Sequence, residues 1–157
     1  MKNFHEYLME VEKEEQQGTF ASLKLDEKSV QKLSEWVAEH KIVNAIEESK
    51  YHCTVVYSRK KVPELEDFSV KLPIRAHFYE WKILDGNVLV LVLKSTRIHS
   101  LFDQTKKLGA ESDYSEYIPH VSIATNWAKK DLPSEIPDFS IVFNEFKVET
   151  LDEDFSY

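Results

Sequence analysis

The chain has little cysteine, no long apolar run and no excess of positive charge. Its single cysteine, Cys53, excludes an internal disulfide and is consistent with a reducing compartment such as the cytosol. The longest apolar run, residues 88–93, has the length of a strand and falls well short of the roughly 20 residues that span a bilayer. The acidic segment 1–17 has no apolar centre typical of a secretory signal. We therefore expect no membrane partner.

The charge balance is acidic and disfavours one class of ligand. The 20 Lys and Arg residues are outnumbered by 28 Asp and Glu residues, which gives a net charge of −8. Extended binding to nucleic acid draws most of its affinity from basic stripes, so a long nucleic-acid partner is disfavoured. A small anionic ligand in a locally basic pocket is compatible with this balance. The hydrophobic content of 42% is typical of a globular chain, and we expect residues 1–157 to form a single domain.

Hydrophobic periodicity predicts an alternation of short strands and helices. Asp26 and Ser29 both qualify as the N-cap of the second helix, and Asp85-Gly86 is a strong hairpin signal. Gly109 is the natural stop of the third helix. The expected helices are 3–16, 29–40 and 95–108, and the expected strands are 19–25, 51–57, 76–84, 87–93, 120–124 and 139–151.

Two tripeptides with the same pattern recur in the two halves of the chain. His52-Cys53-Thr54 and His120-Val121-Ser122 each place a hydroxyl residue two positions after a histidine, within a segment that reads as a strand. Residues i and i+2 of a strand point to the same face, so each motif sets an imidazole beside a hydroxyl. Each motif strand follows a strand and a helix. This order predicts an α+β fold of two pseudo-symmetric lobes, with antiparallel sheets lining a central cleft and helices on the outside.

Two imidazoles and two hydroxyls facing one cleft suit the cleavage of a phosphodiester that has a neighbouring 2′-hydroxyl. This reaction needs a base for the hydroxyl proton, an acid for the leaving 5′-oxygen, and donors to the phosphate oxygens. Histidine suits both proton-transfer roles because its pKa lies near neutrality, and the two rings must then differ in protonation. The reaction requires no metal, and we expect no cofactor.

The paired motifs resemble those of the 2H phosphoesterase superfamily. Within it, the runs 51–55 and 118–122 are most similar to the phage anti-CBASS nucleases, which destroy the cyclic di- and trinucleotide signals of bacterial immunity. The resemblance implies that His52 and His120 are general base and general acid, in an order that stays open. It also implies a small cyclic nucleotide as partner and the cytoplasm of an infected bacterium as location. The usual second hydroxyl in this family is threonine, whereas this chain has Ser122.

The resemblance extends to further residues of the cleft. Thr54 and Ser122 would hold the scissile phosphate. Family members stack bases on aromatic side chains, and Phe20 and Trp81 fit these two positions, although a tyrosine would suit the first better. A late acidic residue reads a base edge, and Glu149 fits this role better than Glu145.

Other interpretations remain open from the sequence alone. The same chemistry could serve an RNA-processing 2′,3′-cyclic or 2′–5′ phosphodiesterase, and a sponge could bind the nucleotide without cutting it. The histidines could be metal ligands, but no third and fourth ligand occurs at a recognisable spacing. Trp81 could fill the core, and Glu149 could face solvent. The sequence does not decide the oligomeric state, nor which of four cations lines the pocket: Lys24, Arg75, Lys82 or Lys147.

Overall fold

The computed structural model describes residues 17–113, 116–128 and 131–154, so the predicted helix 3–16 lies outside the described residues. The described chain has an α+β fold, as the sequence predicted. Its helices are α2 (Glu27–Glu39) and α3 (Thr96–Lys107), with the 3₁₀ turns η1 (Glu48–Lys50) and η2 (Pro63–Asp67). Its strands are β1 (Thr19–Leu25), β2 (His52–Ser58), β3 (Ile74–Leu84), β4 (Val88–Lys94), β5 (His120–Ala124) and β6 (Ile141–Thr150).

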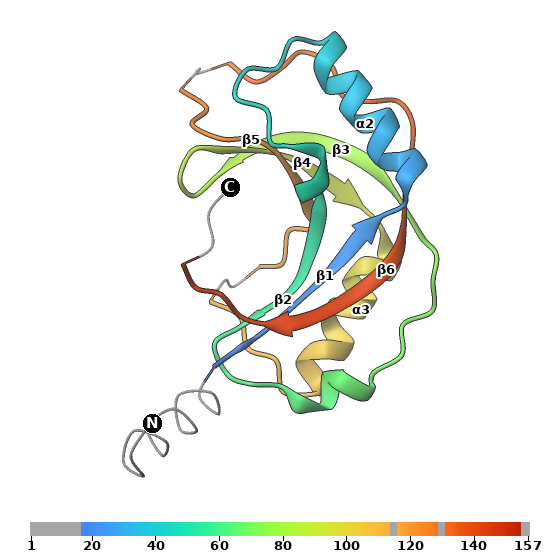
Figure 1. Cartoon of the computed structure of the whole chain (residues 1–157), viewed down its shortest axis with the longest axis vertical. Coiled ribbons are helices and arrows are strands. Elements are labelled where there is room, and N and C mark those ends of the chain that lie inside the picture. Colours follow the sequence, from blue (N-terminus) through green and yellow to red (C-terminus); the bar gives the residue numbers. More distant parts are fainter. Residues whose placement is uncertain (1–16, 114–115, 129–130, 155–157) are drawn as a thin grey trace, which may run out of the picture.

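All six strands belong to one strongly curved antiparallel sheet, shown in Figure 1. Its order is β2-β1-β6-β3-β4-β5, so the strand that is last in the sequence lies in the middle of the sheet. The curvature brings the two end strands, β2 and β5, close to each other. These are the two strands that carry the histidine motifs, and their approach confirms the predicted face-to-face arrangement of the two halves.

Both helices begin at side-chain caps that the sequence contains. The Asp26 carboxylate accepts a hydrogen bond of 2.7 Å from the backbone N–H of Ser29, so Asp26 is the cap of α2 and the helix starts two residues earlier than predicted. Ser95 caps α3 in the same way, through the N–H of Ile98. Gly109 follows α3 with φ of 109°, a conformation that favours glycine.

The helices cover the sheet at opposite ends of the view in Figure 1. Helix α3 packs against β2, and α2 contacts β3 through Trp36 and Trp81. Buried side chains from both helices and from the sheet form one continuous hydrophobic cluster. The motif strands are therefore anchored on a packed core. Within the described ranges, neither helix has the length and apolar content needed to cross a membrane.

Candidate active site

The two reactive side chains of the first motif share one face of β2. His52 pairs with Lys24 of β1, and Thr54 pairs with Ser22. Because directly paired residues share a face of the sheet, these four side chains lie on one surface. Cys53 points to the other face and is fully buried, as the alternation predicted. A register shift in the β1–β2 pairing brings Tyr57, paired with Phe20, back to the motif face.

The second motif is built in the same way at the other end of the sheet. His120 pairs with Val92 of β4, and Ser122 pairs with Val90. Val121, between them, points to the opposite face and is fully buried. His120 and Ser122 therefore share one surface, as His52 and Thr54 do on β2.

A cavity of about 570 Å³ lies where the two motif strands approach each other. Thr54 of the first motif lines it together with His120 and Ser122 of the second. His52 is not part of this lining, but it shares the face of Thr54 and lies close enough to His120 for their charges to interact. The structure thus brings all four predicted motif residues together. The cavity is large enough for one nucleotide-sized portion of a ligand.

Both imidazoles are held by the same contact. The Nδ1 atom of His52 lies 2.8 Å from the carbonyl oxygen of Lys50, and that of His120 lies 2.7 Å from the carbonyl oxygen of Ile118. In each case the partner is the residue two positions earlier. A carbonyl oxygen only accepts, so Nδ1 must carry the proton and donate it. In the neutral ring, Nε2 is then left as the proton acceptor, as a general base requires.

The surroundings lower the pKa of both histidines. For His52 the main cause is burial, and the positive charges of Lys24 and His120 lower its pKa further, against opposing effects of the Lys50 carbonyl and Glu149. For His120 burial again lowers the pKa, opposed by the Ile118 carbonyl. The repulsion between the two rings acts on both and disfavours the state in which both are protonated. This repulsion is a physical source for the difference in protonation that the reaction needs.

Phe20 and Glu149 lie on the same face as the first motif. The ring of Phe20 meets that of His52 edge to face, with centroids 5.9 Å apart. Phe20 pairs with Glu149 of β6, whose carboxylate lies 3.2 Å from the Nζ atom of Lys147. Phe20 and Glu149 therefore share the face of His52 with Lys24 and Lys147, although neither lines the 570 Å³ cavity.

Trp81 lies elsewhere, and its predicted position at the cleft is wrong. It pairs with Leu91, whereas the cleft residues of that sheet region pair with Val90 and Val92. Its ring is 5% exposed, and its centroid lies 6.0 Å from that of Trp36 on α2. Its Nε1 donates a 2.7 Å hydrogen bond to the carbonyl oxygen of Glu135. Trp81 is therefore a core residue, one of the alternatives that the sequence left open.

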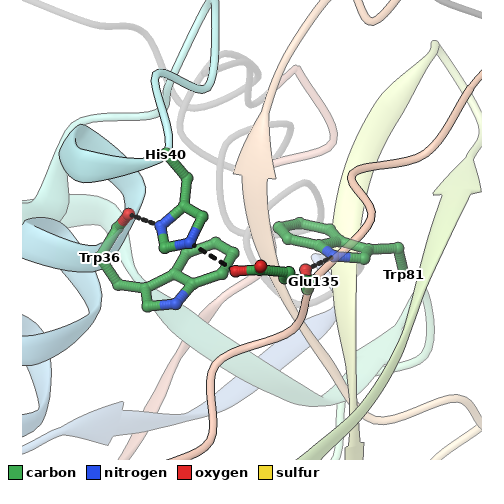
Figure 2. Close-up of polar contacts among 4 residues, drawn as sticks. All are labelled: Trp36, His40, Trp81 and Glu135. Atoms are coloured by element: carbon green, nitrogen blue, oxygen red, sulfur yellow. Dashed lines mark hydrogen bonds and ion pairs between the residues drawn. The ribbon is translucent and has the colours of Figure 1, made fainter.

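Figure 2 shows what surrounds Trp81. The ring of His40, at the end of α2, stacks on that of Trp36 with centroids 3.8 Å apart. Its Nδ1 atom lies 2.8 Å from the Trp36 carbonyl oxygen, and its Nε2 atom lies 3.1 Å from the Glu135 carboxylate. Both partners raise the pKa of His40. Glu135 thus ties its loop to α2 through its side chain and to β3 through its backbone.

One residue near the site was missed by sequence reasoning. Tyr117 precedes the second motif, and its hydroxyl donates a 2.8 Å hydrogen bond to the carbonyl oxygen of Thr54. It also lines the cavity. Its position three residues before His120, outside any predicted strand, provided no periodic signal. Among the described residues, no three His, Cys, Asp or Glu side chains are grouped as metal ligands would be.

Comparisons with known proteins agree with this geometry. Residues 17–157 match the family described as anti-CBASS protein Acb1. The chain is 28% identical over 131 residues to anti-CBASS protein Acb1 of Enterobacteria phage T4, covering 83% of this chain and 86% of that protein. It is 32% identical over 116 residues to the protein of the same name from Escherichia phage RB16, covering 73% and 67% of the two chains.

Among solved structures, the fold is similar to that of Escherichia coli LigT in complex with 3′-AMP. The TM-score is 0.61 with 15% sequence identity, over 84% of this chain and 86% of LigT. At this level of identity the similarity concerns the fold alone. It confirms the predicted resemblance to 2H phosphoesterases in architecture.

Proposed function

We propose that this chain, which belongs to the anti-CBASS protein Acb1 family, cleaves the 3′–5′ phosphodiester bonds of cyclic oligonucleotide second messengers. The single observation that carries the proposal is the matched pair of histidines. Each ring is held through Nδ1 by a backbone carbonyl, and each stands beside a hydroxyl at the meeting point of β2 and β5. The products would be linear nucleotides, and the biological effect would be phage evasion of a bacterial antiviral response in the cytoplasm of the infected cell.

The proposed reaction uses only side chains of the cleft. The neutral imidazole takes the proton of the ribose 2′-hydroxyl through Nε2, and the 2′-oxygen forms a bond to the adjacent phosphorus. The bond from phosphorus to the 5′-oxygen breaks, and the second histidine, as imidazolium, gives its proton to that oxygen. Thr54 and Ser122 donate to the non-bridging oxygens as negative charge grows on them. The result is a 2′,3′-cyclic phosphate on an opened chain, which water can hydrolyse further.

The residues around the histidines fit a nucleotide. Lys24 and Lys147 lie on the face of the first motif and offset the charge of a phosphodiester within an acidic protein. The exposed part of the Phe20 ring is available for stacking, and the Glu149 carboxylate is available as an acceptor for a base amino group. We propose these two as ligand-binding residues.

The test is product analysis with a panel of substrates in the presence of EDTA. The panel contains cyclic di- and trinucleotides, a linear 3′–5′ RNA, a 2′–5′ oligonucleotide and a nucleoside 2′,3′-cyclic phosphate, and chromatography resolves the products. We expect linear products from the cyclic oligonucleotides. Cleavage of only the last three substrates would instead support the RNA-processing function. Binding of a cyclic dinucleotide without product would support a sponge.

Variants of the histidines complete the test. His52→Ala and His120→Ala should each reduce kcat by about 10²–10⁴-fold, the range for loss of a general acid or base. His77→Ala is the matched control, because His77 is exposed on β3 and does not line the cavity. Near-normal activity of either motif variant would contradict the paired role, as would loss of wild-type activity in EDTA.

A further inference from the structure

No ladder of backbone hydrogen bonds joins the two motif strands within the described residues. β2 and β5 are the two ends of the sheet order, and the segment that pairs with β5 on its free side is residues 44–46. That segment leaves β5 before the chain reaches His52. The proposed reaction nevertheless needs both imidazoles at a fixed distance from one phosphate. Contacts other than sheet pairing must therefore set the spacing of β2 and β5.

Tyr117 makes such a contact. It lies three residues before His120, and its hydroxyl donates to the carbonyl oxygen of Thr54, the last residue of the first motif, at 2.8 Å. The Tyr117 hydroxyl oxygen also lies 3.8 Å from the Sγ atom of Cys53, the central residue of that motif. One side chain of the segment that leads into β5 is thus bonded directly to the first motif strand.

The ring of Tyr117 is held in place from α3. It stacks on Phe102 with centroids 4.1 Å apart and an angle of 3° between the planes. His99, one turn earlier, meets it edge to face at 5.7 Å. Burial raises the pKa of Tyr117 well above its usual range, so the hydroxyl keeps its proton and remains a donor at all pH values relevant to the reaction. The ring is ordered by packing, which leaves the hydroxyl aimed at one acceptor.

We infer that Tyr117 is a positioning residue for the proposed reaction, which sets the distance between the His52–Thr54 strand and His120 by bonding one motif to the approach of the other. The inference rests on the proposed function. It assigns no contact with the substrate's reacting atoms to Tyr117. This role of Tyr117 differs from that of an ordinary core residue, because loss of the hydroxyl should reduce turnover more than it reduces the stability of the fold.

The first variant is Tyr117→Phe, which keeps the ring and its stacking on Phe102 and removes only the hydroxyl. We expect kcat to fall by about 10–100-fold with KM changed less than about twofold, because small displacements of reacting groups carry costs of this size. Tyr79→Phe is the control, since Tyr79 is 58% exposed on β3 and should keep wild-type kinetics. A kcat equal to wild type at full folding would overturn the inference.

A second readout does not depend on turnover. The positive charge of His120 contributes to the lowered pKa of His52, so a wider spacing of the strands should weaken this repulsion. An NMR titration of the His52 ring in Tyr117→Phe should therefore give a higher pKa than in the wild type. An unchanged His52 titration would count against positioning even if the wild type proved inactive on every substrate, so this result separates the two proposals.

A third measurement tests the inference with a second variant, in case Tyr117→Phe folds poorly. Phe102→Leu keeps the hydroxyl but removes the ring on which Tyr117 stacks. Phe102→Leu should also lower kcat, by a smaller factor than Tyr117→Phe, and it should likewise raise the pKa of His52. Wild-type kcat and an unchanged His52 titration in folded Phe102→Leu would contradict the role that we give to Tyr117.

Discussion

At the scale of single residues, the chemistry proposed for the site depends on which ring nitrogens of His52 and His120 carry a proton. In both motifs a backbone carbonyl holds Nδ1, and this bond fixes the tautomer and the orientation of the ring at once. Neither carbonyl belongs to a residue whose identity matters for the bond. The contact depends on backbone conformation, so the sequence motif alone does not reveal it. The hydroxyl residues, by contrast, are visible in the sequence because strand alternation places them beside the histidines.

The lowered pKa values lead to a prediction for the pH dependence of cleavage. Both histidines have a pKa below the usual 6.5 in the free protein. The value of kcat/KM reports the free protein and needs one neutral and one protonated ring, so its maximum should lie on the acid side of pH 6.5. It should fall as pH rises through the folded pKa values, because the acid then loses its proton. The measurement is initial rate at low substrate concentration from pH 4.5 to 8.5.

The kcat profile should lie at higher pH than that of kcat/KM. A bound phosphodiester adds negative charge beside both rings and favours the imidazolium form. A kcat/KM maximum above pH 7 would contradict the assignment of both histidines as the titrating groups, as would the same pH profile in an active His120→Ala protein.

The two hydroxyls lead to a second prediction at this scale. Thr54→Val and Ser122→Ala remove one donor each and leave the strands intact. Each should lower kcat by about 10²–10³-fold, the usual effect of removing one donor to developing oxyanion charge. Thr125→Val, beyond the end of β5 and outside the cavity lining, should keep wild-type kcat. Equal loss of activity in the control would point to general damage of the fold.

At the scale of elements, most strands and helices were predicted from the sequence, but the register shift in the pairing of β3 with β4 was not. Strands 19–25 and 120–124 occur with the predicted bounds, because alternation and flanking residues define them. The cleft position predicted for Trp81 rested on the family resemblance, and the local pairing of β3 explains why it is wrong. Simple alternation puts Tyr79 and Trp81 on one face, but the pairing of β3 with β4 shifts between Phe78 and Glu80. One extra residue reverses the faces, so Trp81 joins Phe78 in the core.

This correction yields a prediction that separates Trp81 from Phe20. Trp81→Phe removes the donor to the Glu135 carbonyl and part of a buried ring, so it should lower the free energy of unfolding by about 1–3 kcal/mol. Its KM should stay near the wild-type value. Phe20→Ala should instead weaken ligand binding by about 1–3 kcal/mol if a base stacks on this ring. Urea unfolding and steady-state kinetics on both variants provide the comparison.

The opposite results for the two variants would support the prediction from the sequence that Trp81 stacks on a base. A raised KM and unchanged stability for Trp81→Phe would place that ring at the ligand, and an unchanged KM for Phe20→Ala would remove Phe20 from the site.

At the scale of the whole molecule, the site exists only when the sheet is complete. The motifs belong to strands at its two ends, and its curvature brings these strands close to each other. The sequence predicted this meeting from the repeated order of elements, but it carried no sign of Tyr117 or of the bridge from residues 44–46. Those contacts join segments far apart in the chain and have no periodicity of their own. Global geometry was therefore easier to predict than the contacts that maintain it.

A ligand that contacts both ends of the sheet should stabilise the folded chain. In the His120→Ala variant, a cyclic dinucleotide at a hundredfold excess over its Kd should raise the free energy of unfolding by about 2.7 kcal/mol, because the unfolded chain has no site. Thermal melting with and without the ligand measures this shift. A variant that also carries Phe20→Ala should need more ligand for the same shift. Absence of any shift at millimolar ligand would contradict a binding site at this position.

The central place of β6 has a consequence for synthesis. This strand is the last of the described sheet to leave the ribosome, yet β1 and β3 both pair with it. Until Ile141–Thr150 has emerged, the two portions of the sheet that carry the histidines have no strand between them. A nascent chain that already contains every proposed catalytic side chain should therefore lack the assembled site, and we expect the proposed activity only after β6 has been translated.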